Sequence, residues 1–249
     1  MHRLSRACGR QRQIASGGVA IGAAAGAIIR VLSFIAAAFL VLPVPCASAQ
    51  DATTATISAI PDAVWADMQG KSYNPRIKGC AQRKDLRLLT LPYRDFAGMT
   101  HKGQMIVHRR VAADVRDVFV TLFRTKSFAI DKMVPVDAYG GDDDASMADN
   151  NTSGYNCRKA SGSSRLSSHA RGIAIDVNPL INPYVWRKGT SPPGGHAWDE
   201  PAEREAQRGQ AGLILPDSAL VSAFKAKDWV WGGTWTSSKD YQHFSADGR

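Results

Sequence analysis

The chain has 249 residues, enough for one sizeable domain with additional segments, and its composition of 44% hydrophobic and 21% charged residues excludes disorder throughout. The formal net charge of +9 would suit an anionic polymer, but five of the basic residues are arginines among the first 49 residues, which contain no acid. Removing them leaves 26 basic against 22 acidic residues, a net charge of +4 that does not demand DNA or RNA, so we predict no nucleic-acid partner.

Residues 1–49 have the pattern of an export signal. A basic start is followed by small residues and an apolar block, and Ala47 and Ala49 provide the small side chains that signal peptidase requires at its −3 and −1 sites. The pattern predicts cleavage before Gln50 and an exported protein, periplasmic or secreted. The alternative is an uncleaved anchor over residues 14–44, which would be the protein's attachment to a membrane.

The remainder of the chain divides into a short tether and one domain. Residues 50–61 are small and mostly polar, as is typical of a linker, and residues 62–249 are expected to form a single folded domain. Cleavage of the leader would remove two of the four cysteines and leave Cys80 and Cys157. In an oxidising compartment this pair is expected to form a disulfide, with two free buried thiols as the alternative.

Strand and helix patterns alternate in the first half of this domain. Residues 105–111 are predicted to form a strand that leads into a helix over 111–123. The helix has apolar side chains at helical spacing that are expected to face the core: Val111, Val115, Val118, Phe119 and Leu122. Residues 139–158 are rich in Gly, Asp and Asn and are expected to form a loop. The acidic run Asp142–Asp144 lacks the alternating pattern of a calcium-binding loop, so a solvated loop is the better interpretation.

A strand with one crowded and one open face is predicted over residues 172–177. Its branched aliphatic side chains point to one side, whereas Gly172, Ala174 and Asp176 point to the other. Two small residues beside a carboxylate leave room for a bound group above the strand.

Two further elements complete the predicted domain. A helix is expected over residues 216–227, beginning near Asp217 or Ser218. The final segment, residues 228–245, begins as a strand that the Gly-Gly pair at 232–233 breaks or bulges.

The residues with catalytic potential gather in two polar segments. His169 and Asp176 are seven residues apart, and Asp240 and His243 are three apart. Two imidazoles and one carboxylate are a common ligand set for catalytic zinc, which keeps a fourth position for water. A second carboxylate can then accept the proton of that water, and Asp240 is the candidate. From spacing alone, a satisfied buried histidine and a capping aspartate remain the alternative. Serine-nucleophile, H-E-x-x-H, Walker and dinucleotide motifs are absent from the sequence.

Three motifs, in this order, resemble a known family. S-x-H-x-x-G-x-A-x-D-x-N-P stands at residues 167–179, W-x-W-G-G-x-W at 229–235 and D-x-x-H-F at 240–244. The set resembles the D-alanyl-D-alanine carboxypeptidase-like zinc peptidases, which include bacterial D,D-carboxypeptidases and dipeptidases and endolysin L-alanyl-D-glutamate peptidases. The resemblance covers roughly residues 85–244. It implies an α+β fold, the hedgehog/D,D-peptidase-like zinc peptidase fold, with a small antiparallel sheet and flanking helices.

The resemblance also implies roles for individual residues. The family's Zn²⁺ ligands correspond to three residues here: His169, Asp176 and His243. Asp240 would be the general base and then the acid that protonates the leaving amine. Arg158 matches the family's arginine that faces the scissile carbonyl, with a structural ion pair as the alternative. Ser167 is expected either to hydrogen-bond the substrate or to orient His169.

The residues and the resemblance together predict an exported zinc peptidase, a monomer, that hydrolyses an amide bond in the stem peptide of peptidoglycan. Removal of terminal D-alanine and cleavage between L-alanine and D-glutamate are equally compatible with the motifs. A zinc-containing cell-wall-binding module without turnover is a second class, which an Asp240→Asn variant would separate from an enzyme. A basic polymer-binding surface protein is a third, and its binding would be sensitive to salt and independent of metal.

Overall fold

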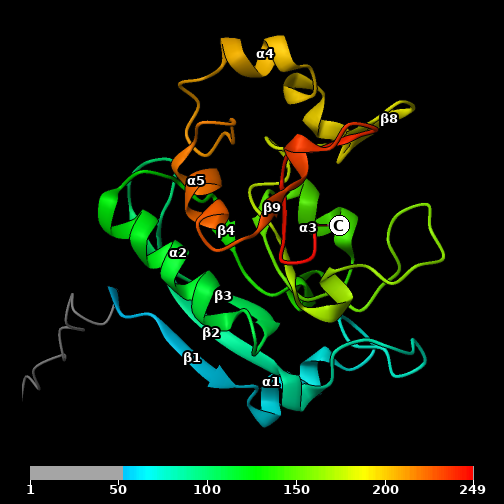
Figure 1. Cartoon of the computed structure of the whole chain (residues 1–249). Coiled ribbons are helices and arrows are strands. Elements are labelled where there is room, and N and C mark those ends of the chain that lie inside the picture. The colour runs from blue at the N-terminus through cyan, green and yellow to red at the C-terminus, as the bar shows by residue number, and fades with distance from the viewer. Residues whose placement is uncertain (1–52, 249) are drawn as a thin grey trace, which may run out of the picture. The chain divides into compact units, whose positions relative to one another are not determined.

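The computed structural model describes residues 53–248, whose arrangement is shown in Figure 1. The predicted leader, residues 1–49, lies outside the described residues. Within residues 53–248, no helix combines the length and the apolar character that crossing a membrane would require.

An antiparallel sheet of three strands forms the first part of the fold (Figure 1). Its strands, in spatial order, are β1 (Thr56–Ala59), β2 (Leu86–Arg94) and β3 (Thr100–His108). Helix α2 (Ala112–Thr125) follows β3 and packs against β2. The strand and the helix predicted over residues 105–123 are therefore present, and β3 begins earlier than expected because it pairs with β2 along its whole length.

Strand β1 lies where a tether was expected. Thr56–Ala59 pair with residues 87–90 of β2, so the prediction of a linker over residues 50–61 is wrong for this part. The strand is short and mostly exposed, and only Ile57 is partly buried, where it packs against the main apolar cluster. An edge strand is held mainly by backbone hydrogen bonds to its neighbour, and four residues that alternate between polar and apolar are too few to stand out as a strand in the sequence.

Helix α2 buries the face that its spacing predicts. The buried side chains are Val115, Val118, Phe119 and Leu122, together with Val111 just before the helix. They pack against one face of the sheet, formed by Leu89, Leu91, Met105 and Val107. Full burial of an aliphatic or aromatic side chain of this size contributes about 1.5–3 kcal/mol, so this interface is a principal source of stability.

A second three-stranded sheet carries the C-terminal motifs. Its strands, in spatial order, are β6 (Ala174–Asp176), β11 (His243–Ser245) and β9 (Val230–Trp231), all antiparallel. Helix α5 (Ala219–Lys225) packs against β9. It begins after Ser218, whose hydroxyl accepts a hydrogen bond from the backbone N–H of Val221, as the helix predicted over 216–227 requires. Residues of β6 and β11 are buried in the same apolar cluster as α2, so the two sheets share one core.

Shorter elements complete the described chain. Strands β10 (Lys239–Asp240), β7 (Tyr184–Trp186) and β8 (Gly189–Ser191) form an antiparallel sheet in that order, and β4 (Lys132–Met133) and β5 (Asn151–Thr152) form a parallel pair. The other α-helices are α1 (Asp62–Met68), α3 (Asp143–Ala148) and α4 (Pro201–Ala206). The 3-10 helices are η2 (Arg83–Asp85), η3 (Val136–Tyr139), η4 (His169–Arg171), η5 (Pro193–Trp198) and η6 (Gly232–Thr234). This mixture of helices and mainly antiparallel strands confirms the predicted α+β class.

Helix α3 lies within the segment that was expected to be a loop. Asp142 is its N-cap, and the side chain accepts a hydrogen bond from the backbone N–H of Ala145 at 3.1 Å. Asp143 and Asp144 occupy the first turn, where the positive end of the helix dipole favours acidic side chains. The acidic run therefore starts a helix, and its prediction as a solvated loop is wrong.

The predicted disulfide joins Cys80 and Cys157, whose Cα atoms are 5.6 Å apart. The bridge belongs to a second apolar cluster that includes Leu88 and Ile106. These side chains alternate with the α2-facing residues of β2 and β3, so the first sheet is covered on both faces. Because Cys157 directly precedes Arg158, the disulfide also fixes the start of the segment 158–171, which contains Arg158 and His169.

A buried arginine anchors the long excursion between β6 and α5. Arg204 of α4 is 2% exposed, and its guanidinium lies 3.9 Å from the ring centroid of Tyr241. It donates hydrogen bonds to four oxygens, those of the Ile181, Trp198 and Ile214 carbonyls and of the Asn182 side chain. Burial lowers the pKa of Arg204 to about 10, and the four acceptors compensate for the lost hydration of its charge. Tyr241 directly follows Asp240 in the chain, so the contact with Arg204 helps to hold the segment that contains Asp240.

Candidate metal centre and active site

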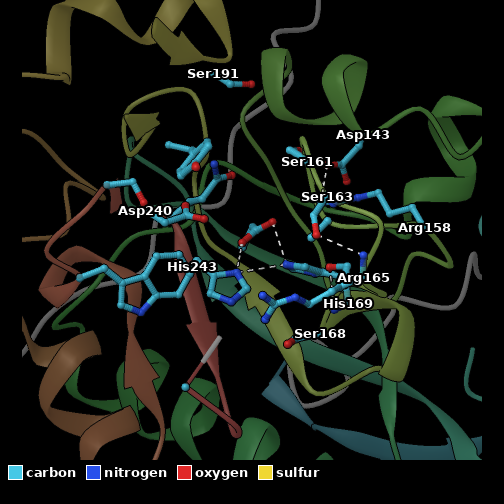
Figure 2. A pocket seen from close by; sticks show the side chains of 18 of the residues that line it. Asp143, Arg158, Ser161, Ser163, Arg165, Ser168, His169, Ser191, Asp240 and His243 are labelled. Atoms are coloured by element: carbon cyan, nitrogen blue, oxygen red, sulfur yellow. Dashed lines mark hydrogen bonds and ion pairs between the residues drawn. The ribbon is translucent and has the colours of Figure 1, made fainter. Parts of the chain in front are cut away.

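The sequence motifs meet around a pocket of about 1060 Å³. Its lining comes mainly from the segments 158–171 and 234–243, together with Asp176 of β6. Figure 2 shows Asp240 and His243 on one side of the pocket and Arg158 and His169 on the other. Residues that are far apart in the sequence therefore face one another across a space large enough for a peptide.

Two of the three predicted metal ligands lie directly opposite each other in the second sheet. His243 of β11 pairs with Asp176 of β6, and the side chains of opposed residues project from the same face of a sheet. The third, His169, begins η4, which ends at Gly172 with a φ of +66°. A Cβ on Gly172 would lie 2.8 Å from the backbone nitrogen of His108, so this turn requires glycine.

The three ligand atoms are spaced as a metal ion requires. His169 Nε2 is 3.2 Å from His243 Nδ1 and 3.2 Å from Asp176 Oδ2, and His243 Nδ1 is 3.1 Å from Asp176 Oδ1. Around a tetrahedral Zn²⁺ with bonds of about 2.0–2.1 Å, neighbouring ligand atoms would be about 3.3 Å apart. The exposed fractions of His169, Asp176 and His243 are only 3%, 6% and 5%. The group can therefore hold a single metal ion with little rearrangement.

The orientation of His169 is fixed by two hydrogen bonds. Its Nδ1–H donates to the carbonyl oxygen of Gly154 at 2.7 Å, which leaves the Nε2 lone pair directed at the other two ligands. The hydroxyl of Ser167 accepts a hydrogen bond from the backbone N–H of His169 at 3.2 Å. Of the two roles expected for Ser167, this contact is the orienting one, although Ser167 also lines the pocket.

The neighbours of Asp176 favour its charged form. Burial alone would raise the pKa of this carboxyl, but the imidazoles of His169 and His243 outweigh burial and lower the pKa below its ordinary range. Asp176 is therefore a carboxylate at neutral pH, as a metal ligand must be.

Asp240, the predicted general base, belongs to the short strand β10, which lines the pocket. A Cβ on Gly232 would lie only 2.6 Å from the carbonyl oxygen of Asp240, so this glycine lets the strand pass close to η6. Oδ1 of Asp240 is buried and has no hydrogen-bond partner within residues 53–248. Burial raises the pKa of Asp240 to about 7, against the opposing effects of His243 and Arg158. A carboxyl with a pKa near neutrality is suited to accept and return a proton.

Arg158 lines the pocket and is held by an acid from α3. Its Nη2 is 2.6 Å from Oδ2 of Asp143, and Asn156 donates a hydrogen bond to the other carboxylate oxygen at 3.3 Å. The ion pair that was the structural alternative for Arg158 is therefore present, in a position that also faces the site. Asp143 was missed as a site residue because it lies in a segment expected to be loop. The only signal for its placement was the helix-capping potential of Asp142.

Aromatic residues of the W-x-W-G-G-x-W motif lie next to the three candidate metal ligands. Trp231 is buried, and its indole N–H donates to the carbonyl oxygen of Tyr241 at 2.9 Å. Trp235 lines the pocket, and its ring centroid is 5.4 Å from that of His243. The motif therefore supplies both core packing behind the site and part of its wall.

Comparison with protein families matches residues 161–246 to the family described as D-alanyl-D-alanine carboxypeptidase. The matched segment contains His169, Asp176, Asp240 and His243, and Arg158 lies just before it. Comparisons with curated proteins and with solved structures gave no match. The family match agrees with the resemblance drawn from the three motifs, and it supports a peptidase. Over residues 161–246, the chain is therefore similar to the family described as D-alanyl-D-alanine carboxypeptidase.

Proposed function

We propose that the protein is an exported Zn²⁺-dependent peptidase that hydrolyses an amide bond in the stem peptide of peptidoglycan. The observation that carries this proposal is the convergence of His169, Asp176 and His243 in a pocket that Asp240 also lines. The family match over residues 161–246 supports the reaction class. The leader pattern and the disulfide, a bond that persists in oxidising compartments, support export.

The donor set favours Zn²⁺ over other common cations. Two imidazole nitrogens and one carboxylate oxygen suit zinc, whereas Ca²⁺ and Mg²⁺ prefer six or more oxygen ligands. His169, Asp176 and His243 would hold the ion and leave its remaining position open to the pocket. A bound ion of this kind polarises a substrate carbonyl and lowers the pKa of water.

Asp240 moves the proton. Its carboxylate accepts a proton from the attacking water as the water oxygen bonds to the carbonyl carbon. The carboxyl then gives this proton to the nitrogen as the carbon–nitrogen bond breaks, so the products are a carboxylic acid and a free amine. Oδ1 of Asp240, which is buried and has no hydrogen-bond partner in the described part of the chain, is available for this transfer.

Arg158 stabilises the charge that develops on the carbonyl oxygen. A guanidinium held by Asp143 is already oriented before the substrate binds, so little reorganisation is needed. A single donor in such a position contributes about 3–4 kcal/mol to transition-state stabilisation in other enzymes.

Two stem-peptide bonds are candidates, and mass spectrometry separates them. Stem peptides are incubated with the protein, with and without a chelator. Loss of one alanine identifies a carboxypeptidase that removes terminal D-alanine, whereas a cut between L-alanine and D-glutamate identifies an endopeptidase. We expect the chelator to stop the reaction and added Zn²⁺ to restore it. Stem peptides that stay intact with the zinc-loaded protein would overturn the proposal, and retained wall binding without cleavage would favour a binding module.

A further inference from the structure

Of the three arginines that line the pocket, one has no counter-charge among residues 53–248. Arg158 pairs with Asp143, and Arg171 pairs with Asp247 at 2.5 Å. The side chain of Arg165 forms no hydrogen bond and no ion pair with any residue in the described part of the chain, and it is exposed to the pocket. A cation left without a partner in a cleft is available to a ligand.

Local backbone pairing directs Arg165 into the pocket. Within residues 158–167, Lys159 and Leu166 form an antiparallel bridge, and backbone hydrogen bonds flank it on both sides. Because side chains alternate along paired strands, Arg158 and Arg165 project from one face of this hairpin and Lys159 from the other. Figure 2 shows Arg165 alongside His169, on the same side of the pocket as Arg158.

The charges around the pocket leave Arg165 in excess. A divalent cation would be balanced by the two carboxylates of Asp176, in the candidate ligand group, and Asp240, in the pocket lining, and the other two arginines are balanced by their own aspartates. One positive charge, that of Arg165, then remains. The pocket is therefore complementary to a substrate with one negative charge near the reacting bond.

We propose that Arg165 binds a free carboxylate of the substrate, carried by the residue whose amine is released. This inference rests on the proposed peptidase function and defines its substrate class. A terminal D-alanine has a carboxylate on the carbon that bears this amine. So does D-glutamate in the stem peptide, because it is linked onward through its side-chain carboxyl. A guanidinium recognises such a group through two parallel hydrogen bonds, so one residue would serve either reaction.

The test compares substrates that differ only in this carboxylate. The probes are an acylated D-alanyl-D-alanine peptide and its C-terminal amide, and an L-alanyl-D-glutamyl peptide and its α-amide. The wild-type protein should cleave the acid of its preferred pair with a kcat/KM about 10- to 100-fold above that of the amide. Arg165→Gln should lose this preference, mainly through a higher KM for the acid, while cleavage of the amide is unchanged. Arg165→Lys should restore part of the preference because it keeps the charge.

Lys159→Gln is the matched control, because it removes the same charge from the opposite face of the same hairpin and should leave the preference intact. An equal loss on acid and amide in Arg165→Gln, or no loss on either, would overturn the role of Arg165 while the peptidase function stands. Calorimetric binding of both peptides to zinc-loaded Asp240→Asn provides a second readout. Binding that prefers the acid and depends on Arg165 supports the inference even if the wild type cleaves neither peptide, and binding without that preference refutes it.

Discussion

The two sides of the pocket are built in different ways. Asp176 and His243 lie opposite each other in a sheet whose other face belongs to the shared core. Arg158 and Arg165 project from the hairpin at 158–167, which is fixed by an ion pair, a bridge and the nearby disulfide. We infer that the sheet side binds the metal, whereas the hairpin side serves turnover and substrate choice. Loss of a side chain from the sheet should remove the metal, whereas loss of one from the hairpin should impair turnover or substrate choice while the metal stays bound.

The largest effect is expected from the sheet side. His243→Ala removes one of three ligands, so bound metal should fall from one ion per chain to a trace, and peptide cleavage should drop on the order of 10³-fold or more. Elemental analysis and a cleavage assay on the same sample measure both. His196→Ala removes an exposed histidine outside the pocket and should change neither. Full activity in His243→Ala would contradict the claim that the sheet side binds a metal that cleavage requires.

Asp240→Asn should lower kcat by roughly 10²- to 10⁴-fold while one ion per chain remains bound. An amide cannot accept the proton of water, but it has nearly the same shape as the carboxylate. Steady-state kinetics and metal content are measured together. Asp144→Asn, at an exposed position of α3, is the control for a lost carboxylate. Metal loss in Asp240→Asn would assign this residue to the ligands instead.

Arg158→Gln should lower kcat/KM by roughly 10²- to 10³-fold, the cost of losing one donor to the developing oxyanion. Metal content should be unchanged, because no ligand contact is lost. Arg208→Gln is the control, since it removes ion pairs that are exposed and lie outside the pocket. An activity within twofold of wild type would leave Arg158 with only its structural ion pair to Asp143.

Replacing Cys80 and Cys157 together by serine should lower the free energy of unfolding by about 2–4 kcal/mol, because the unfolded chain gains freedom. Chemical denaturation with and without reductant measures this change. Below the unfolding transition, the metal content should equal that of the wild type. Reductant should destabilise the wild type and leave the serine variant unchanged. If reductant also destabilises the serine variant, the loss of the disulfide does not explain the effect of reductant.

The smallest effect is expected from Ser167→Ala. The loss of the hydrogen bond to the His169 backbone should weaken metal affinity by about 10-fold at most. A competition titration against a chromogenic chelator measures the affinity, with Ser161→Ala as a control at an exposed position of the pocket. Unchanged affinity with a raised KM would instead place Ser167 on the substrate.

The sequence was informative where residue identity alone defines a role. The motifs singled out His169, Asp176 and His243, and α2 buries the face that its spacing predicts. What could not be foreseen is the register that sets His243 opposite Asp176, because pairing depends on how distant strands pack and not on local pattern.

Elements without a strong local pattern were missed. Strand β1 is held mainly by its neighbour's backbone, and its alternation of polar and apolar residues extends over only four positions. Asp143 reaches Arg158 only because a short helix is capped by Asp142, a weak signal in a segment rich in turn-forming residues. Arg165 gave no signal either, since an unpaired charge is recognisable only when the surrounding partners are placed.

Titration of the metal-free protein with Co²⁺ tests the central claim most directly, since Co²⁺ occupies zinc sites and its visible absorption reports the coordination geometry. We expect one ion per chain with the intense absorption of a four-coordinate site, and loss of this spectrum in Asp176→Asn and His169→Ala but not in Arg158→Gln. Binding that is weak and non-stoichiometric, or a spectrum that survives both ligand substitutions, would contradict a metal centre made by His169, Asp176 and His243.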